Sequence, residues 1–166
     1  MTAPNVAPPD WRKQQKERIS FYSLDPQKIK ILEGGKEITA NSIVSVLIYF
    51  RINRDKTNSP VGSMMGEALL AYGNGAKKWG KLDLRNIRWD GQVFAWESKE
   101  AQIVINTIIA KRFEQNPYAR AAVLSADEEL LREIAKEDSA HGLFSEEWCF
   151  RALRSYQVFK KAEARR

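Results

Sequence analysis

Asp138 and His141 are the two residues whose types and spacing come closest to a catalytic pair. They stand three positions apart, and His141 is the single histidine of the chain. A carboxylate beside an imidazole can support general acid–base chemistry, or the two side chains can hold a polar ligand. The same spacing also suits a loop between two helices in which one residue is polar and the other is a cap. The sequence leaves both interpretations open.

The scarcity of metal-binding and nucleophilic residue types excludes several classes of enzyme. A single cysteine, Cys149, excludes an internal disulfide framework and a zinc ribbon, and we expect it in the core because free cysteine behaves as a small hydrophobic residue. A single histidine excludes a two-histidine metal site and any mechanism that needs two imidazoles. The chain has no phosphate-binding loop, dinucleotide fingerprint, nucleophile elbow or CxxC pair. The sequence therefore predicts neither a metal nor a cofactor.

Basic and aromatic side chains gather in two short segments that could contact a partner. The candidate contact residues are Trp11, Arg12, Lys13, Lys77, Lys78 and Trp79. Trp11 is a lone aromatic residue in a polar arm, which suggests an anchor on another surface. The net charge of +6 is moderate, so these segments could hold the phosphates of a nucleic acid or contact a protein assembly. Charge runs of this kind are also common on solvated faces.

The elements that must position these residues are mostly helices. A chain of 166 residues fits one domain, and 43% apolar with 29% charged residues is typical of a globular protein. Alternation over 28–32 and the pair Gly34-Gly35 predict an antiparallel hairpin over 28–39. Helices are expected over 42–53, 61–72 and 96–114, from 126 behind a capping Ser125, and from 145 onwards, with a loop-rich stretch over 74–95. The predicted fold class is mostly α, with a small N-terminal antiparallel β element.

Both ends of the chain are predicted to be basic tails. Residues 1–18 contain three prolines and bury little, residues 19–158 form the domain, and residues 159–166 close the chain with lysine and arginine. No apolar run approaches the roughly 20 residues of a membrane-spanning helix, and the N-terminus lacks the pattern of a signal peptide. We therefore expect a cytoplasmic protein without a membrane partner.

Three segments, in their order and spacing, resemble the NADAR (YbiA-like) family. Ser45 to Arg51 reads SVLIYFR, which is similar to the family's S-V-E-H-Y-F-Q. Arg112 to Pro117 reads RFEQNP, which is similar to its K-F-x-Q-N-P, and Leu124 to Glu133 resembles its L-L-A-T-G-D-x-x-L-V-E stretch. Characterised members are N-glycosidases that act on ADP-ribose-type or riboflavin-precursor N-glycosidic bonds. The resemblance runs from about residue 19 to residue 156 and implies a single domain of this type.

The resemblance also implies where a ligand would lie. Trp96 falls at the family's ligand-stacking position, and an aromatic face can bind a base or a nicotinamide ring. Tyr49, Arg51 and Asp138 fall in matched segments and complete the implied ligand contacts.

The departures from the family pattern concern the residues that do chemistry. The family's helix glutamate, thought to polarise the bond or accept a proton, falls at Leu47, and the neighbouring histidine falls at Ile48. An aliphatic side chain cannot act as a general base. Beyond Asp138, the family's tryptophan is replaced by His141, and its glycine-rich turn is replaced by residues 143–148.

We therefore expect a divergent, non-catalytic NADAR-like protein that binds either a nucleotide-like ligand of the ADP-ribose type or a macromolecular partner. One alternative is an active N-glycosidase in which Asp138, His141 and Trp96 take rearranged roles. Another is a nucleic-acid-associated or assembly subunit without a small-molecule pocket. An enzyme would need Asp138 and Trp96 to converge in a concave site with a second acid. An assembly subunit would have that pocket filled.

Overall fold

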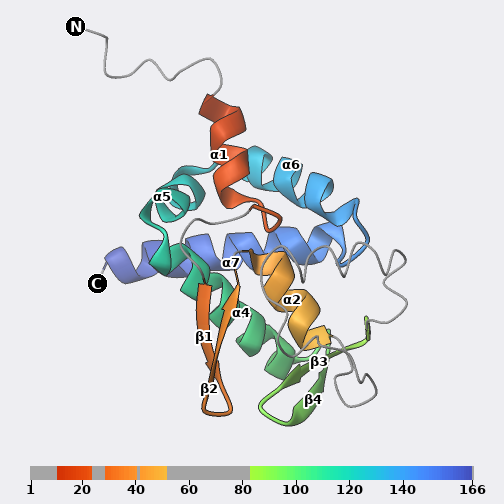
Figure 1. Ribbon diagram of the computed structural model, residues 1–166. Coiled ribbons are helices and arrows are strands. Elements are labelled where there is room, and N and C mark those ends of the chain that lie inside the picture. Colours follow the sequence, from red (N-terminus) through yellow and green to blue (C-terminus); the bar gives the residue numbers. More distant parts are fainter. Residues whose placement is uncertain (1–10, 24–28, 41, 52–82, 166) are drawn as a thin grey trace, which may run out of the picture.

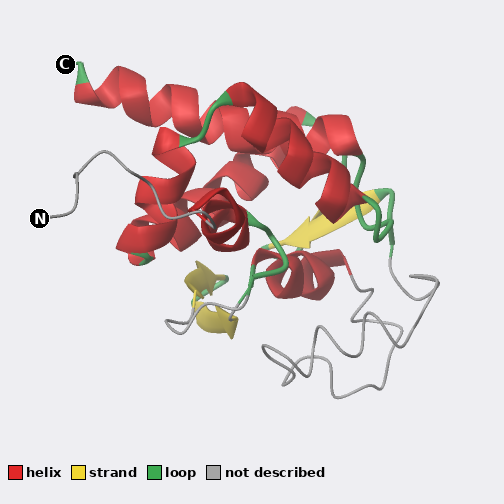
Figure 2. Cartoon of the chain, turned by 90° about the horizontal axis from the view of Figure 1, so that it is seen from above, coloured by secondary structure: helices red, strands yellow, loops and turns green. Residues whose placement is uncertain are grey.

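The computed structural model describes residues 11–23, 29–40, 42–51 and 83–165. These residues form helices and two β-hairpins (Figure 1): α1 (Trp11–Ile19), β1 (Ile29–Glu33), β2 (Lys36–Ala40), α2 (Ile43–Arg51), β3 (Asn86–Trp89), β4 (Gln92–Ala95), α4 (Lys99–Gln115), α5 (Pro117–Ser125), α6 (Glu128–Ser139) and α7 (Glu146–Ala164). Helices dominate the view from above (Figure 2). The prediction of a mostly α fold with a small antiparallel β element is confirmed.

The first hairpin forms where the sequence predicts it. β1 pairs with β2 in an antiparallel register that places Ile31 opposite Ile38, and both side chains are buried. Gly34 and Gly35 make the turn with φ values of 56° and 79°. Side chains with a Cβ rarely adopt this left-handed conformation, so the glycine pair fixes the turn.

A second hairpin occupies the described part of the stretch predicted to be rich in loops. β3 pairs with β4, and Asp90 and Gly91 make the turn with φ values of 51° and 75°. An Asp-Gly pair favours a two-residue hairpin turn, and this signal outweighs the weak apolar pattern of the short strands. The backbone N–H of Asp90 donates to the Glu33 carboxylate at 2.9 Å. The two hairpins therefore meet at their tips, at the lower edge of the molecule in Figure 1.

The core is centred on α2, α4 and α7. Every residue of α2 is buried, as its apolar sequence predicts. The predicted stripe of α4 is also buried, and its members are Ala101, Val104, Ile105, Ile108 and Ile109. α4 begins after its cap Ser98, whose hydroxyl accepts from the backbone of Ala101 at 3.1 Å. α7 crosses the middle of the molecule and packs on α4, α5 and α6 (Figure 1).

Helix α1 corrects the prediction of an N-terminal tail through residue 18. Residues 11–19 are helical and pack on α5 and α6, although only Gln15 and Ile19 of α1 are buried. The Gln15 amide donates to the Ala122 carbonyl oxygen at 3.0 Å and to the Ser125 hydroxyl at 3.1 Å. α1 is therefore held largely by polar contacts with distant residues. A search for hydrophobic periodicity does not detect a helix held in this way.

The C-terminal boundary needs a similar correction. α7 continues to Ala164, so residues 159–164 are the last turns of a helix instead of a tail, although all of them except Lys160 are exposed. The helix predicted over 61–72 lies outside the described residues. No helix in the described ranges has the length and apolar character needed to cross a membrane.

Arg112 of α4 links the end of α1 to the core. It is 1% exposed, and its guanidinium donates to the carbonyl oxygens of Arg18 and Ile19, each at 2.7 Å. Carbonyl groups at the end of a helix lack partners within that helix. Arg112 supplies the missing donors for α1 from inside the protein.

We expect Arg112→Ala to lower the free energy of unfolding by about 2–5 kcal/mol, because it leaves two carbonyl groups without donors and removes buried packing. Chemical denaturation of the wild type and the variant measures this loss. The neighbouring Lys111 is exposed, so Lys111→Ala should stay within about 0.5 kcal/mol. Equal effects of the two substitutions would contradict the assigned role of Arg112.

Candidate functional site

Arg51 and Trp96 meet in the core, at the position where the family resemblance implies a ligand. Arg51 ends α2, and Trp96 lies between β4 and α4. The guanidinium carbon of Arg51 lies 3.7 Å from the centroid of the Trp96 ring. Trp96 also stacks on Trp148 of α7, with ring centroids 4.5 Å apart and an interplanar angle of 28°. Trp96 is 7% exposed, and its ring packs against these two side chains.

Backbone carbonyl groups hold the buried charge of Arg51 in place. Its guanidinium donates to the carbonyl oxygen of Leu143 at 2.5 Å and to that of Leu84. Burial lowers the pKa of Arg51 to about 10, and the negative charge of Asp83 opposes this shift. The side chain therefore stays charged at neutral pH. It ties the end of α2 to the segments that precede β3 and α7.

Tyr49, Leu47 and Ile48, which fall at further positions matched to the family's site, also lie in the core. Tyr49 is 3% exposed and packs edge-on against Phe50, with ring centroids 5.2 Å apart. Leu47 and Ile48 are both fully buried. None of these three residues lines the hollows of about 510, 490 and 410 Å³ on the described surface. Like Arg51 and Trp96, these side chains therefore serve the packing of the core.

Asp138 and His141 are neighbours, but the carboxylate is engaged elsewhere. Asp138 lies near the end of α6 and is 6% exposed. Its two oxygens accept hydrogen bonds from the Ser20 hydroxyl at 2.7 Å and the Phe21 backbone N–H at 2.9 Å. His141 is exposed in the following turn, and its ring centroid lies 4.3 Å from that of Tyr22. Asp138 therefore fastens the end of α1 and the residues after it to α6.

Burial dominates the electrostatics of Asp138. Removal of water raises the pKa of its carboxyl group, whereas the hydrogen bonds from Ser20 and Phe21 and the nearby charges of His141 and Arg112 oppose the rise. The net direction is upward. A carboxyl group of this kind could take part in proton transfer, but a substrate must first reach it.

The hollow between α1 and α6 is where Asp138 reaches the surface. It measures about 410 Å³, and Lys13, Tyr22 and Asp138 are among its lining residues. It therefore joins a predicted partner contact, Lys13, to a predicted ligand contact, Asp138. Lys16 and Glu137 form an ion pair at 2.6 Å on the same lining. Trp96 is not part of this lining, so the convergence of Asp138 with Trp96 that an enzyme would need is missing from the described hollows.

The predicted N-terminal contact residues are engaged by their own chain. Trp11 is half-buried, and the Arg18 guanidinium lies 5.9 Å from its ring centroid. Arg12 contacts the carboxylate of Glu133 at 3.1 Å and lies near two further acids of the α6 segment. Lys13 is exposed. The second predicted set, Lys77, Lys78 and Trp79, lies outside the described residues.

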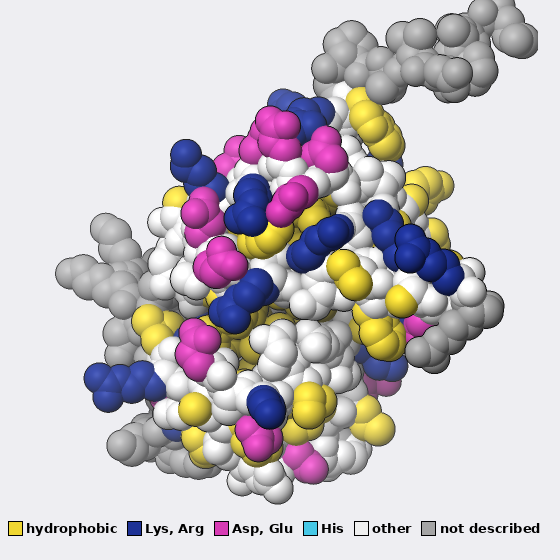
Figure 3. All heavy atoms as spheres, turned by 180° about the vertical axis from the view of Figure 1, so that it is seen from behind, with side chains coloured by type: hydrophobic (Ala, Val, Ile, Leu, Met, Phe, Trp, Pro, Cys, Tyr) yellow, Lys and Arg dark blue, Asp and Glu magenta, His cyan; other side chains and the backbone are white. Residues whose placement is uncertain are grey.

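Charges of both signs are mixed on the rear face of the molecule. Figure 3 shows lysine and arginine side chains interspersed with aspartate and glutamate on the rear face, with hydrophobic side chains between them. Phosphate binding favours a patch or stripe of one sign. The described residues also hold no group of three or more histidine, cysteine, aspartate or glutamate side chains that could bind a metal ion.

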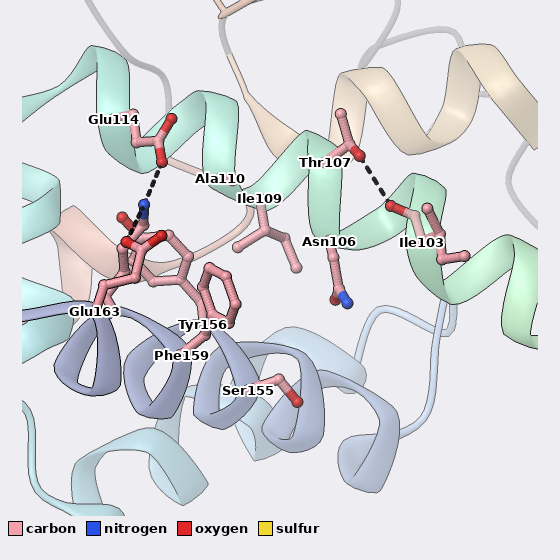
Figure 4. A pocket seen from close by; sticks show the side chains of 11 residues that line it. Ile103, Asn106, Thr107, Ile109, Ala110, Glu114, Ser155, Tyr156, Phe159 and Glu163 are labelled. Carbon is pink, nitrogen blue, oxygen red and sulfur yellow. Dashed lines mark hydrogen bonds and ion pairs between the residues drawn. The ribbon is translucent and has the colours of Figure 1, made fainter. Parts of the chain in front are cut away.

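A groove between α4 and α7 is the feature that sequence analysis missed. It measures about 510 Å³ and is lined by Ile103, Asn106, Thr107, Ile109, Ala110, Glu114, Ser155, Tyr156, Phe159, Lys160 and Glu163 (Figure 4). Three of these residues, Phe159, Lys160 and Glu163, belong to the segment 159–166 predicted to be a tail. The available signal was the spacing of Tyr156 and Phe159, three positions apart, which continues an apolar helix face.

Comparison with known proteins yields no match: no family model, no curated protein and no solved structure matches the chain. The likeness to the NADAR family therefore rests on the three segments of the sequence quoted above.

We expect Trp96→Ala to lower the free energy of unfolding by about 3–5 kcal/mol, the range for truncating a buried aromatic side chain. Tyr118 is 71% exposed, and Tyr118→Ala provides a matched aromatic control with an effect of about 0.5 kcal/mol or less. Denaturant unfolding compares the two variants. A Trp96 variant as stable as the control would contradict the close packing of the Trp96 ring in the core.

Asp138 predicts a definite pH dependence. Because its pKa is raised in the folded state, the folded protein binds more protons than the unfolded chain above about pH 4, up to the raised pKa. Stability from this group is therefore greatest at low pH and falls as pH rises through that window. The free energy of unfolding of the wild type minus that of Asp138→Asn should decrease as pH rises from about 4 through the raised pKa of Asp138. A constant or increasing difference would contradict the raised pKa.

Proposed function

We propose that this protein is a divergent, non-catalytic NADAR-like binding protein whose ligand is a macromolecular partner. One observation carries the proposal: the ring of Trp96 is covered by Arg51 and Trp148, where the resemblance implies a bound ligand. The proposal thus takes the macromolecular branch of the expected function over the nucleotide branch.

The energies of the contacts favour this choice. A base that stacked on Trp96 would have to displace a neighbour such as Arg51 from the ring. Displacement of Arg51 would leave the carbonyl groups of Leu84 and Leu143 without their donor, and each unsatisfied buried group costs about 1–3 kcal/mol. Base–aromatic stacking contributes about 1–3 kcal/mol. The gain is therefore offset by the cost before the ligand's own desolvation is counted.

The residues at the family's two acid–base positions support a non-catalytic role. Leu47 and Ile48 are aliphatic and fully buried, so they can neither polarise a glycosidic bond nor accept a proton. Asp138 is engaged by Ser20 and Phe21. We therefore place the active N-glycosidase second.

A protein partner fits the described surface better than a nucleic acid. Large apolar side chains on α4 and α7 are exposed, including Ile103 at 66% and Phe159 at 62%. Clustered apolar side chains between two helices are typical of a surface that binds another protein. The mixed charges in Figure 3 offer no comparable feature for a phosphate backbone.

Titration calorimetry with ADP-ribose, beside a hydrolysis assay on ADP-ribosylated substrate, tests the proposal. We expect neither binding heat nor released product, because the stacking position is filled. An active NADAR enzyme in the same buffer serves as the positive control. Saturable binding without turnover would restore the nucleotide-binding alternative. Turnover would establish the N-glycosidase, and either result would overturn the proposal.

A further inference from the structure

We propose that the groove between α4 and α7 binds an amphipathic helix of a partner protein, with a basic residue of that helix at the Lys160 end. This inference rests on the proposed function, because it names the class of partner and the surface that binds it.

The floor of the groove is apolar and lies between two helices. Ile109 of α4 and Tyr156 of α7 are 1% and 6% exposed. Figure 4 shows Tyr156 and Phe159 extending from α7 toward Ile109 of α4. A volume of about 510 Å³ falls within the range of sites that accept large apolar groups. A helix laid in such a groove inserts side chains from one face, at positions i, i+3 or i+4, and i+7.

The two lips of the groove leave large apolar side chains in water. Ile103 on α4 is 66% exposed, and Phe159 on α7 is 62% exposed. Both line the groove. A partner that filled the groove would cover both side chains at once. Single exposed apolar residues scattered over a surface could not be covered together in this way.

Two carboxylates face the solvent at one end of the groove, and the positive charge of Arg120 lies near Tyr156 of its floor. Lys160 contacts Glu114 at 2.5 Å and Glu163 at 3.1 Å. The Lys160 side chain is 13% exposed, whereas those of Glu114 and Glu163 are 44% and 48% exposed. Two half-exposed carboxylates thus surround one covered ammonium group. A lysine or arginine of the partner complements this end.

The opposite end of the groove is polar but uncharged. Asn106 and Thr107 of α4 and Ser155 of α7 lie there (Figure 4). The hydroxyl of Thr107 already donates to the Ile103 carbonyl oxygen at 2.9 Å. Because only one end carries exposed carboxylates, a bound helix has one preferred direction. Its basic residue then lies beside Glu114 and Glu163.

Selection from a display library of helical peptides, using the full chain as the target, tests the inference. We expect enrichment of peptides that combine an apolar i, i+3/i+4, i+7 face with lysine or arginine at one end. Fluorescence anisotropy of the best-enriched labelled peptide then measures affinity. Phe159→Asp and Ile103→Asp should each weaken binding at least about tenfold by placing a charge against the apolar face.

Two further variants separate specific docking from general stickiness. Leu32 of β1 is 68% exposed, so Leu32→Asp is a matched control that should leave the affinity unchanged. Glu163→Lys should weaken the basic peptide severalfold and favour a version of that peptide with glutamate in place of its basic residue. Circular dichroism verifies that each variant remains folded.

Three results would overturn the inference. The first is that the library yields no peptides enriched on the wild type over the Phe159→Asp variant. The second is that a scrambled peptide of the same composition binds equally well. The third is that the free chain is a dimer, which Phe159→Asp dissociates. The last result would assign the groove to a second copy of the chain. None of these results bears on the response to ADP-ribose. They would therefore overturn the groove as a binding site without overturning the proposed function, which the calorimetry tests separately.

Discussion

A guanidinium group packed on a tryptophan ring inside the core constrains the rest of this protein. Arg51 must keep its charge solvated by protein groups, and it does so through the carbonyl oxygens of Leu84 and Leu143. These bonds join α2 to the segments before β3 and α7. Trp96 and Trp148 complete the cluster. This cluster occupies the place where the family resemblance implies a ligand, and for that reason the proposed function uses another surface.

Other buried polar side chains also hold the ends of helices or the segments next to them. Arg112 donates to the last carbonyl groups of α1, and Gln157 of α7 donates to the carbonyl oxygens of Val123 and Ala126 at the end of α5. Asp138 does the converse for the segment after α1, since its carboxylate accepts from that segment. Each contact stabilises the fold by giving a buried polar group a hydrogen-bond partner from a distant segment.

The sequence predicts those parts of the fold in which hydrophobic periodicity is strong. The burial of α2, the apolar stripe of α4 and the turn at Gly34-Gly35 all follow from local pattern. α1 does not, because Gln15 and Arg112 hold it through contacts with residues about a hundred positions away. The groove was missed for a related reason: a lysine-rich end suggested a tail, whereas Phe159 and Lys160 belong to α7. Trp96 shows that a family position alone cannot distinguish a ligand platform from a core residue.

A double-mutant cycle on Arg51 and Trp96 tests the central claim most directly. Arg51→Met, Trp96→Leu and the combined variant are unfolded in denaturant alongside the wild type. If the two side chains form one buried unit, their coupling free energy should be about 1–3 kcal/mol, as for contacting residues and desolvated cation–π pairs. Effects that add to within about 0.5 kcal/mol would show that the ring is independent of Arg51 and would contradict a filled ligand position.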